Sequence, residues 1–472
     1  MRRRIQVAWF GVFLVLVWGR SLRAQADAPP AHPLTLSEAI NYSLAHYPAV
    51  RAALERIQAA QGGVSLAMTN YLPSANTLWQ SNRATANNTF GLLLPQGVIP
   101  PISGPVLPTT SNRSVWGSAG GILFSWEPFD FGYRRATVDV ARAGEGIARG
   151  QADLTRLDVA AAAGNAFFSL LASEQVTRAA HANVTRREVL AKSVHVLVEN
   201  DLRPGADASR ADAELAVAKT QLIHAQTAER ISRAVFVDIL GIRGTNVEVD
   251  AGPLLGSEPQ ADLPVVALNA HPAATAQQAQ VEQVKAREHA LDRSFVPHFM
   301  TQAALAGRGS GANTDGTYAG GLNGLGLERM NYAAGITVTF PVFDYFSNRA
   351  HKKIEAANQK VEEARYDQTL QGLSDQVEQA EATLAGARSV AENTPVELAS
   401  ARASEAQARA RYQSGLATIV EVSEAEALLV QAEIDDALAR LNVWRGLEGV
   451  AVAQGNLEPF LGILRSDTGK KP

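Results

Sequence analysis

The sequence predicts a mainly α-helical chain with a smaller β-part in a membrane, built as two copies of one structural unit. Three observations predict this fold class. Short motifs recur in the same order in both halves, which indicates an internal duplication. Two stretches rich in small residues are long enough for helices of about 100 Å each. Two further stretches are poor in charge and rich in Gly, Asn, Thr, Ser and aromatic residues.

The N-terminal segment has the features of a secretory signal peptide. Three arginines follow Met1, residues 5–18 are apolar, and an Ala-x-Ala sequence ends at Ala26. This apolar stretch is shorter than the roughly 20 residues of a spanning helix, so cleavage after Ala26 is preferred to a membrane anchor. The chain has no cysteine, which excludes disulfides, thiolate nucleophiles and lipidation of a mature N-terminal cysteine.

The duplication has three landmarks in each half. These are a helix that starts at a His-Pro or His-x-Pro sequence, a strand that ends in Pro and Phe-Asp, and a glycine turn between two long helices. They occur in the first half at His46, Pro128 and Gly205, and in the second at His271, Pro341 and Gly415.

Each half therefore reads helix, β-hairpin, long helix, tip turn, helix. The predicted units are a signal peptide 1–26, a first repeat 34–250 with its hairpin at 72–128, a Gly/Pro-rich linker 251–262, a second repeat 263–458 with its hairpin at 296–342, and a C-terminal tail 459–472.

The long helices are expected at 129–203 and 343–414, each roughly 110 Å long at 1.5 Å per residue. Two shorter helices in each half together match one long helix, which predicts four rods of equal length, as in the wall of a hollow tube. Heptad-like spacing of apolar residues, as from Val430 to Trp444, predicts coiled-coil contacts and also fits an ordinary antiparallel bundle. Pro395 is expected to break or kink the second long helix.

The low-charge stretches are expected to form two β-strands each. Beyond the signal peptide no apolar run is long enough for a spanning helix, so membrane insertion would require a β-barrel. Four strands cannot close a barrel, whereas three chains would supply twelve, an allowed even number. The alternative is a soluble β-domain that caps a helical bundle. The long loop 85–113 is expected to face outward, and its role is open.

The second turn resembles the tip of a known family. Residues 412–425, Tyr-Gln-Ser-Gly-Leu-Ala-Thr-Ile-Val-Glu-Val-Ser-Glu-Ala, resemble the helix-turn-helix tip of non-lipidated TolC-like outer-membrane efflux proteins, and the duplication resembles theirs along nearly the whole mature chain. The resemblance implies a homotrimer with a 12-stranded β-barrel among outer-membrane lipids and a 12-helix α-barrel across the periplasm. It also implies a passive exit duct for a tripartite efflux pump or a type I secretion system, with a periplasmic adaptor and an inner-membrane pump as partners.

The resemblance also assigns candidate site residues at the tip. Glu421 and Glu424 match an acidic pair that lines the closed pore, and Tyr412 matches a tyrosine that holds the tip shut. The alternative for the two glutamates is an ordinary solvated helix face. The family's tip arginine is Ala417 here, and Ala211 offers no acidic partner, so the gate should be held differently. The expected adaptor contacts, which also suit plain turns, are Arg203, Pro204, Gly205, Ala206, Asp207, Gly415, Leu416, Ala417 and Thr418.

Other chemistry finds no support in the sequence. There is no nucleophile elbow, phosphate loop or metal-ligand spacing among the nine histidines, so we expect no enzyme activity, cofactor or metal. The net charge of −4 and the lack of basic clusters with aromatics argue against nucleic acid. The competing interpretations are a periplasmic coiled-coil adaptor or scaffold protein and a secreted enzyme on a helical scaffold. The exported substrate and the partner pump stay open.

Overall fold

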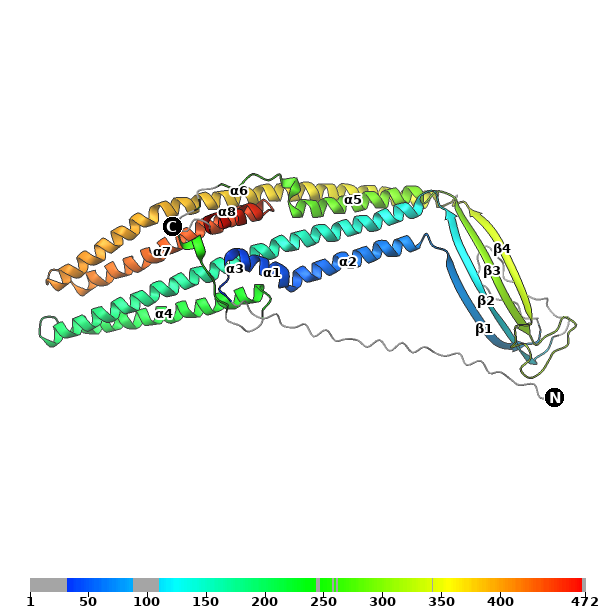
Figure 1. The fold of residues 1–472 in the computed structure, drawn as a ribbon, viewed down its shortest axis with the longest axis horizontal. Helices are drawn as coiled ribbons and strands as arrows, with labels where there is room; N and C mark the ends of the chain where they lie inside the picture. Colours follow the sequence, from blue (N-terminus) through cyan, green and yellow to red (C-terminus); the bar gives the residue numbers. More distant parts are fainter. Residues whose placement is uncertain are drawn as a thin grey trace.

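The structure is a computed structural model and describes residues 32–87, 110–242, 247–256, 259, 262–341 and 343–468. The predicted signal peptide and most of the predicted loop 85–113 lie outside these residues. Figure 1 shows an elongated, mainly helical molecule with a four-stranded sheet at one end. The first half contains α1 (Leu36–His46), α2 (Pro48–Thr69), β1 (Ser74–Thr85), β2 (Ser114–Phe129), α3 (Tyr133–Glu199) and α4 (Gly205–Ile239).

The second half repeats this order after a connection that contains two short 3-10 helices. No helix in the described part of the chain combines the length and the apolar character needed to cross a membrane. The elements of the connection and of the second half are η1 (Gly252–Leu255), η2 (Leu268–Ala270), α5 (Pro272–Arg293), β3 (His298–Ser310), β4 (Arg329–Thr339), α6 (Asp344–Gln413), α7 (Ile419–Ala453) and α8 (Glu458–Thr468).

Two very long helices form the frame of the molecule. Helices α3 and α6 have 67 and 70 residues, which corresponds to about 100 Å each. Helices α2 and α4 follow one another along α3, and α5 and α7 do the same along α6. Helix α3 also packs against α5 and α7, so the two halves share one continuous helical layer.

Pro395 was expected to break or kink α6; the break is wrong, because α6 continues through this residue. Proline removes one backbone hydrogen bond, but it does not by itself end a helix that packs against a neighbour on one side. Ala391, Thr394 and Ala401 are buried on α6 close to the proline, and α6 packs along α7. Tertiary packing therefore holds the helix across a local defect.

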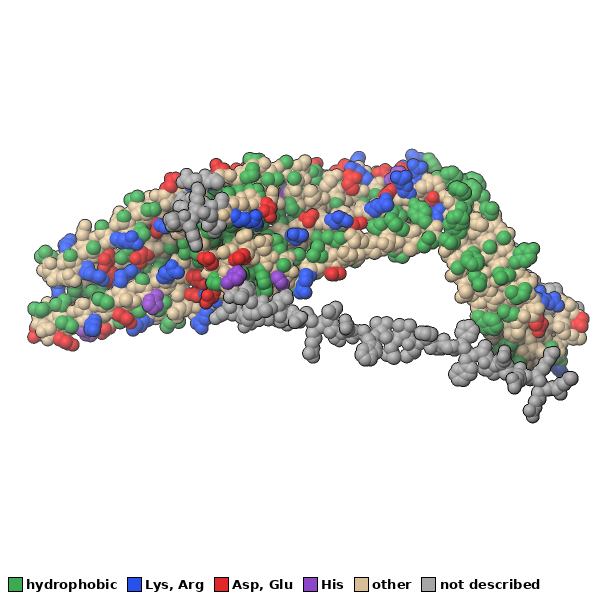
Figure 2. Space-filling model, viewed as in Figure 1, with side chains coloured by type: hydrophobic (Ala, Val, Ile, Leu, Met, Phe, Trp, Pro, Cys, Tyr) green, Lys and Arg blue, Asp and Glu red, His purple; other side chains and the backbone are tan. Residues whose placement is uncertain are grey.

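The sheet is antiparallel, with the strand order β1-β2-β3-β4. Side chains alternate between its two faces, and one face is mostly small or polar, with Gln80, Gln302 and Asn331 among its residues. The other face is apolar and exposed, and Figure 2 shows apolar side chains gathered over this end while charged ones lie mainly along the helices. Exposed residues of the apolar face are Trp79, Phe124, Trp126, Leu305, Met330, Tyr332 and Ile336.

The largest core lies midway along the helices. There the aromatic rings of Phe167, Phe236, Trp444 and Phe460 are fully buried where α3, α4, α7 and α8 meet. Burying a large apolar side chain stabilises a fold by about 1.5–3 kcal/mol. This middle core therefore fixes the helical hairpins relative to one another, while the sheet and the tips extend from it in opposite directions (Figure 1).

Candidate functional site

The tips of the two helical hairpins, α3–α4 and α6–α7, lie at the end farthest from the sheet (Figure 1). Both turns end their first helix in the same way. In the first, Asp201 adopts the left-handed conformation at φ 55°, and the N–H of Leu202 donates to the carbonyl of Leu197. In the second, Gly415 takes the left-handed position at φ 78°, and the N–H of Leu416 donates to the carbonyl five residues before it. Such a left-handed residue is a common way to end a helix.

The equivalence of Gly205 and Gly415 predicted from the sequence is therefore wrong. Gly205 is the first residue of α4, directly after Pro204. The position that corresponds to Gly415 is Asp201. Aspartate adopts the left-handed conformation more readily than most residues other than glycine, so the first turn does not require a glycine.

A polar latch joins the two hairpins at the tip. The side chain of Tyr412 in α6 is buried, and its hydroxyl donates to Asp207 in α4 at 3.2 Å. The guanidinium of Arg203 lies over the Tyr412 ring at 4.4 Å and donates to its backbone carbonyl. Burial, and then the nearby charge of Asp207, raise the pKa of Tyr412. The acidic partner of the tyrosine is thus Asp207, which lies one helical turn before Ala211, the position at which the family resemblance places an acidic residue.

Glu421 and Glu424 are both exposed on the first turns of α7. The carboxylate of Glu421 accepts from the backbone N–H of Thr418 at 3.1 Å and so caps its own helix. It also lies 3.9 Å from a guanidinium nitrogen of Arg411. Residues three apart share a helix face, and Val422 between them is buried. This protomer therefore presents two carboxylates on one exposed stripe beside the tip.

The remaining tip residues divide into exposed and buried ones. Among the predicted contact residues, Ala417 is buried within the tip, so its side chain cannot serve as an outer contact. Leu416 is 71% exposed, and Leu202, which is not among the predicted contact residues, is 67% exposed at the equivalent position of the other turn. Each hairpin therefore ends in one exposed leucine.

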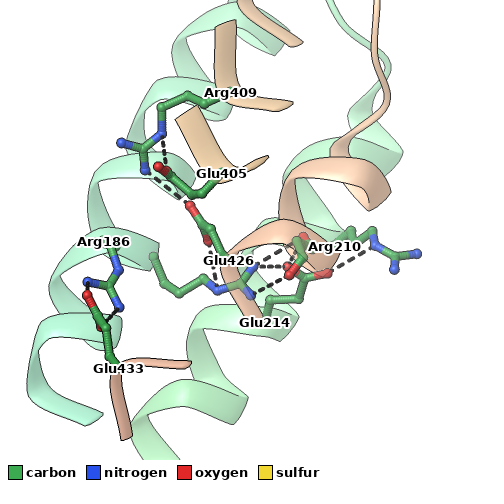
Figure 3. Close-up of polar contacts among 9 residues, drawn as sticks. Arg186, Arg210, Glu214, Glu405, Arg409, Glu426 and Glu433 are labelled. Atoms are coloured by element: carbon green, nitrogen blue, oxygen red, sulfur yellow. Dashed lines mark hydrogen bonds and ion pairs between the residues drawn. The ribbon is translucent and has the colours of Figure 1, made fainter. Parts of the chain in front are cut away.

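A buried ionic cluster lies just behind the tip and was missed from the sequence. Glu426 of α7 is fully buried, and its carboxylate forms ion pairs with Arg187 of α3 at 3.0 Å and Arg409 of α6 at 3.1 Å. Arg187 also donates to Glu214 of α4 and, at 3.1 Å, to both the hydroxyl and the carbonyl oxygen of Ser423. Arg187, Ser423 and Glu426 are buried, while the side chains of Glu214 and Arg409 are partly exposed. We call these five residues the buried cluster; it joins all four helices of the tip region (Figure 3).

The electrostatics of the cluster are dominated by burial. Loss of water raises the pKa of Glu426, although Arg187 and Arg409 oppose this effect. A separate ion pair, Arg186 with Glu433 at 2.9 Å, also connects α3 to α7, but its side chains are about one-fifth exposed, at 21% and 22% (Figure 3). The same two hairpins are thus joined by one buried and one water-accessible ionic contact.

Glu448 is a second buried carboxyl group, in the middle core. It is 1% exposed and lies against Gly164 of α3, where any side chain would collide with its carboxylate. Burial raises the pKa of Glu448 to about 8. The group therefore carries a proton at neutral pH, although its neighbour Arg445 favours the ionised form.

A sequence signal for the buried cluster did exist. Ile419, Val422 and Leu429 are buried at a helical spacing of three and seven, and Glu426 lies between them on the same seam. Arg187 occupies the corresponding place between Val184 and Ala191 of α3. A charged residue on an otherwise apolar seam indicates a buried pair.

Comparison with known proteins gives the family. The model of the family described as "Outer membrane efflux protein" matches residues 39–241 and 263–456, one stretch in each half. No curated protein sequence matches the chain. The family match confirms the resemblance drawn from the second turn, and it favours the duct over an adaptor or scaffold protein.

Several solved outer-membrane channels share the fold. The CmeC channel of Campylobacter jejuni has a TM-score of 0.73 at 15% identity, over 92% of this chain and 89% of that chain. CusC has a TM-score of 0.73 at 14% identity, over 89% and 92%. The open state of the Neisseria gonorrhoeae MtrE channel has a TM-score of 0.70 at 18% identity, over 89% of each chain. These matches confirm the predicted fold class of long helices with a membrane sheet.

Proposed function

Because the chain belongs to the family of outer membrane efflux proteins, we propose that three copies form a passive exit duct through the outer membrane and across the periplasm. The duct serves a tripartite efflux pump or a type I secretion system. A periplasmic adaptor contacts its tips, and a pump in the inner membrane supplies the substrate. The observation that carries the proposal is the pair of open edges on the sheet.

Strands β1 and β4 each have one neighbouring strand among the described residues. An exposed edge is a template for pairing with another chain, and three four-stranded sheets make a barrel of twelve strands, an allowed even number. On the helical side, α4 and α6 are the outermost helices of the tip region. Both carry exposed apolar side chains, which are Val217, Ile223 and Ile231 on α4 and Val361, Val390 and Val396 on α6.

These two sides of the molecule favour a closed ring of identical copies, in which every copy makes the same contact with the next. The β1 and α4 side of one copy meets the β4 and α6 side of the next, and such head-to-tail contacts close when the rotation completes a circle. The exposed apolar face of the sheet then faces the membrane lipid, and its polar face lines the channel.

At the tip, we propose Glu421 and Glu424 as the pore constriction. Three copies bring six carboxylates together, which selects cations and holds multivalent ones. The contact of Tyr412 with Asp207 keeps the tip closed. The residues of the two turns, from Arg203 to Asp207 and from Gly415 to Thr418 apart from the buried Ala417, are the proposed adaptor contacts.

Single-channel conductance of the purified protein in planar bilayers tests the proposal. We expect small, cation-selective openings that multivalent cations block when added on the tip side. Glu421→Gln with Glu424→Gln should relieve the block, because glutamine keeps the helix cap at position 421 but not the charge. Glu392→Gln, an exposed position on α6, is the control and should leave the block unchanged.

The outcomes separate the parts of the proposal. Conductance without block would keep the duct and reject the two glutamates as the constriction. A well-folded trimer that conducts nothing would reject the duct itself.

A further inference from the structure

Arg187 is the residue through which the buried cluster joins the two hairpins. Its guanidinium extends from α3 and reaches Glu214 on its own hairpin and both Ser423 and Glu426 on the other. Its side chain is 9% exposed, and that of Glu426 is 0% exposed. All three guanidinium nitrogens therefore have partners, and one planar group holds two hairpins together.

The cluster is placed where it can control the tip. Between it and the turns lies a small apolar core, in which Val194 of α3 and Val422 of α7 are fully buried together with Tyr412. The latch between Tyr412 and Asp207 lies beyond this core. When the latch at the tip is released, the guanidinium of Arg187 therefore still connects α3 to α7 on the inner side of this apolar core.

We propose that Arg187 is an internal lock of the tip, and that opening requires its guanidinium to withdraw from Ser423 and Glu426 on α7. The inference rests on the proposed duct and names a residue that controls its opening apart from the latch at the turns. Within one hairpin, Glu426 keeps its contact with Arg409 and Arg187 keeps its contact with Glu214. Each hairpin therefore retains a partner for its buried charge when the two separate.

Each hairpin keeps charges of both signs around the lock, although the two groups carry opposite net charges, positive on the α3–α4 side and negative on the α6–α7 side. On the α3–α4 side, Glu214 faces Arg187 and also pairs with Arg210 at 3.1 Å. On the α6–α7 side, Arg409 lies between Glu426 and Glu405, at 3.1 and 3.2 Å. Separation of the hairpins thus divides the network into two groups that each contain both signs of charge, and no charge is left alone.

The test measures the conductance of closed channels in planar bilayers with Arg187→Met. We expect the open fraction to rise about tenfold, which corresponds to losing roughly 1.4 kcal/mol of closed-state stabilisation. Arg187→Lys should behave similarly, because an ammonium group cannot reproduce the planar fork that reaches α4 and α7 at once. Arg186→Met is the matched control, since it removes the neighbouring contact between the same helices that water already reaches, and it should change the open fraction less than Arg187→Met does.

A crosslink provides the converse test. Because the chain has no cysteine, Arg186→Cys and Glu433→Cys can be added to the Arg187→Met protein, and a short bis-thiol reagent then ties α3 to α7. The crosslink should return the open fraction to the wild-type level. The double variant Arg187→Met with Glu426→Gln also removes the buried carboxylate with which Arg187 pairs, so it covers the case in which the single variant does not assemble.

The outcomes are distinct. Assembled trimers of either variant that stay as closed as the wild type would overturn the lock, and so would an equal increase from Arg186→Met. A leak that the crosslink does not reduce would also overturn it. A wild-type trimer that never conducts would instead overturn the proposed duct, and with it the role of Arg187.

Discussion

At the residue scale, Glu448 makes the stability of the middle core dependent on pH. Its carboxyl has a pKa of about 8 in the fold, against an ordinary value of 4.5. Between these values the folded chain holds a proton that the unfolded chain has released. Stability from this group is therefore fully present below about pH 4.5 and falls as the pH rises, by roughly 1.4 kcal/mol per pH unit until the folded group also ionises.

The corresponding prediction concerns Glu448→Gln, which keeps the shape of the side chain and removes the ionisation. The variant should gain thermal stability relative to the wild type at pH 8 and lose most of that advantage at pH 5. Circular dichroism of the helices during heating at both pH values measures this difference. Glu392→Gln, an exposed change on α6, is the control. An equal advantage at both pH values would contradict the ionisation argument.

Some of the residues at the tip could be identified from the sequence, and others could not. Tyr412 was selected through its family resemblance, and the structure places it against Asp207. Arg187 and Glu426 were not selected, because most charged residues on helices lie on solvated faces and pair spacing alone does not reveal partners 239 positions apart. Only the fold shows that these two charges meet in a buried layer. Their roles therefore could be identified only from the three-dimensional structure.

At the element scale, the two turns offer a matched comparison. Asp201 and Gly415 occupy the same left-handed position at the end of α3 and α6. Asp201→Gly should stabilise the first turn and Gly415→Ala should destabilise the second, each by about 1 kcal/mol, because a side chain at positive φ carries a steric cost. Thermal unfolding of both variants checks the signs. A loss of stability from Asp201→Gly would show that the aspartate side chain makes a compensating local bond.

The elements themselves were largely predictable from the sequence. The long helices were expected at 129–203 and 343–414, and α3 and α6 occupy Tyr133–Glu199 and Asp344–Gln413. Repetition made this possible, because each half supports the assignment of the other. The errors came from single residues. Proline disfavours the interior of a helix, but packing along α7 keeps α6 continuous through Pro395. Glycine favours the left-handed conformation, but in the first turn Asp201 takes that conformation and Gly205 does not.

At the scale of the whole molecule, the two faces of the sheet should respond differently to charge. Ile336 lies on the apolar face and is 71% exposed, while Thr337 beside it points to the other face. Ile336→Arg should lower the stability of the membrane-inserted protein by about 1–2 kcal/mol, because an arginine on the lipid face is costly and this cost decreases from the middle of the bilayer toward its edge. Thr337→Arg should have a smaller effect on stability and should alter ion selectivity.

Urea titration of folded protein in lipid vesicles measures the first effect, and conductance measures the second. Equal destabilisation by both substitutions would mean that the assignment of the two faces is wrong. A larger effect from Thr337→Arg would mean that the faces are reversed.

The pairing of β2 with β3 also affects how the chain folds during synthesis. The side chains of Glu127 and His298 meet across this junction although 171 positions separate them in the chain. A chain made from its N-terminus therefore completes β1 and β2 long before β3 exists, and β2 waits with an unpaired edge and an apolar face. Long-range pairing of this kind is slow, and open edges invite aggregation. Until the second half of the chain is available, the first repeat therefore carries a strand edge that only β3 can pair.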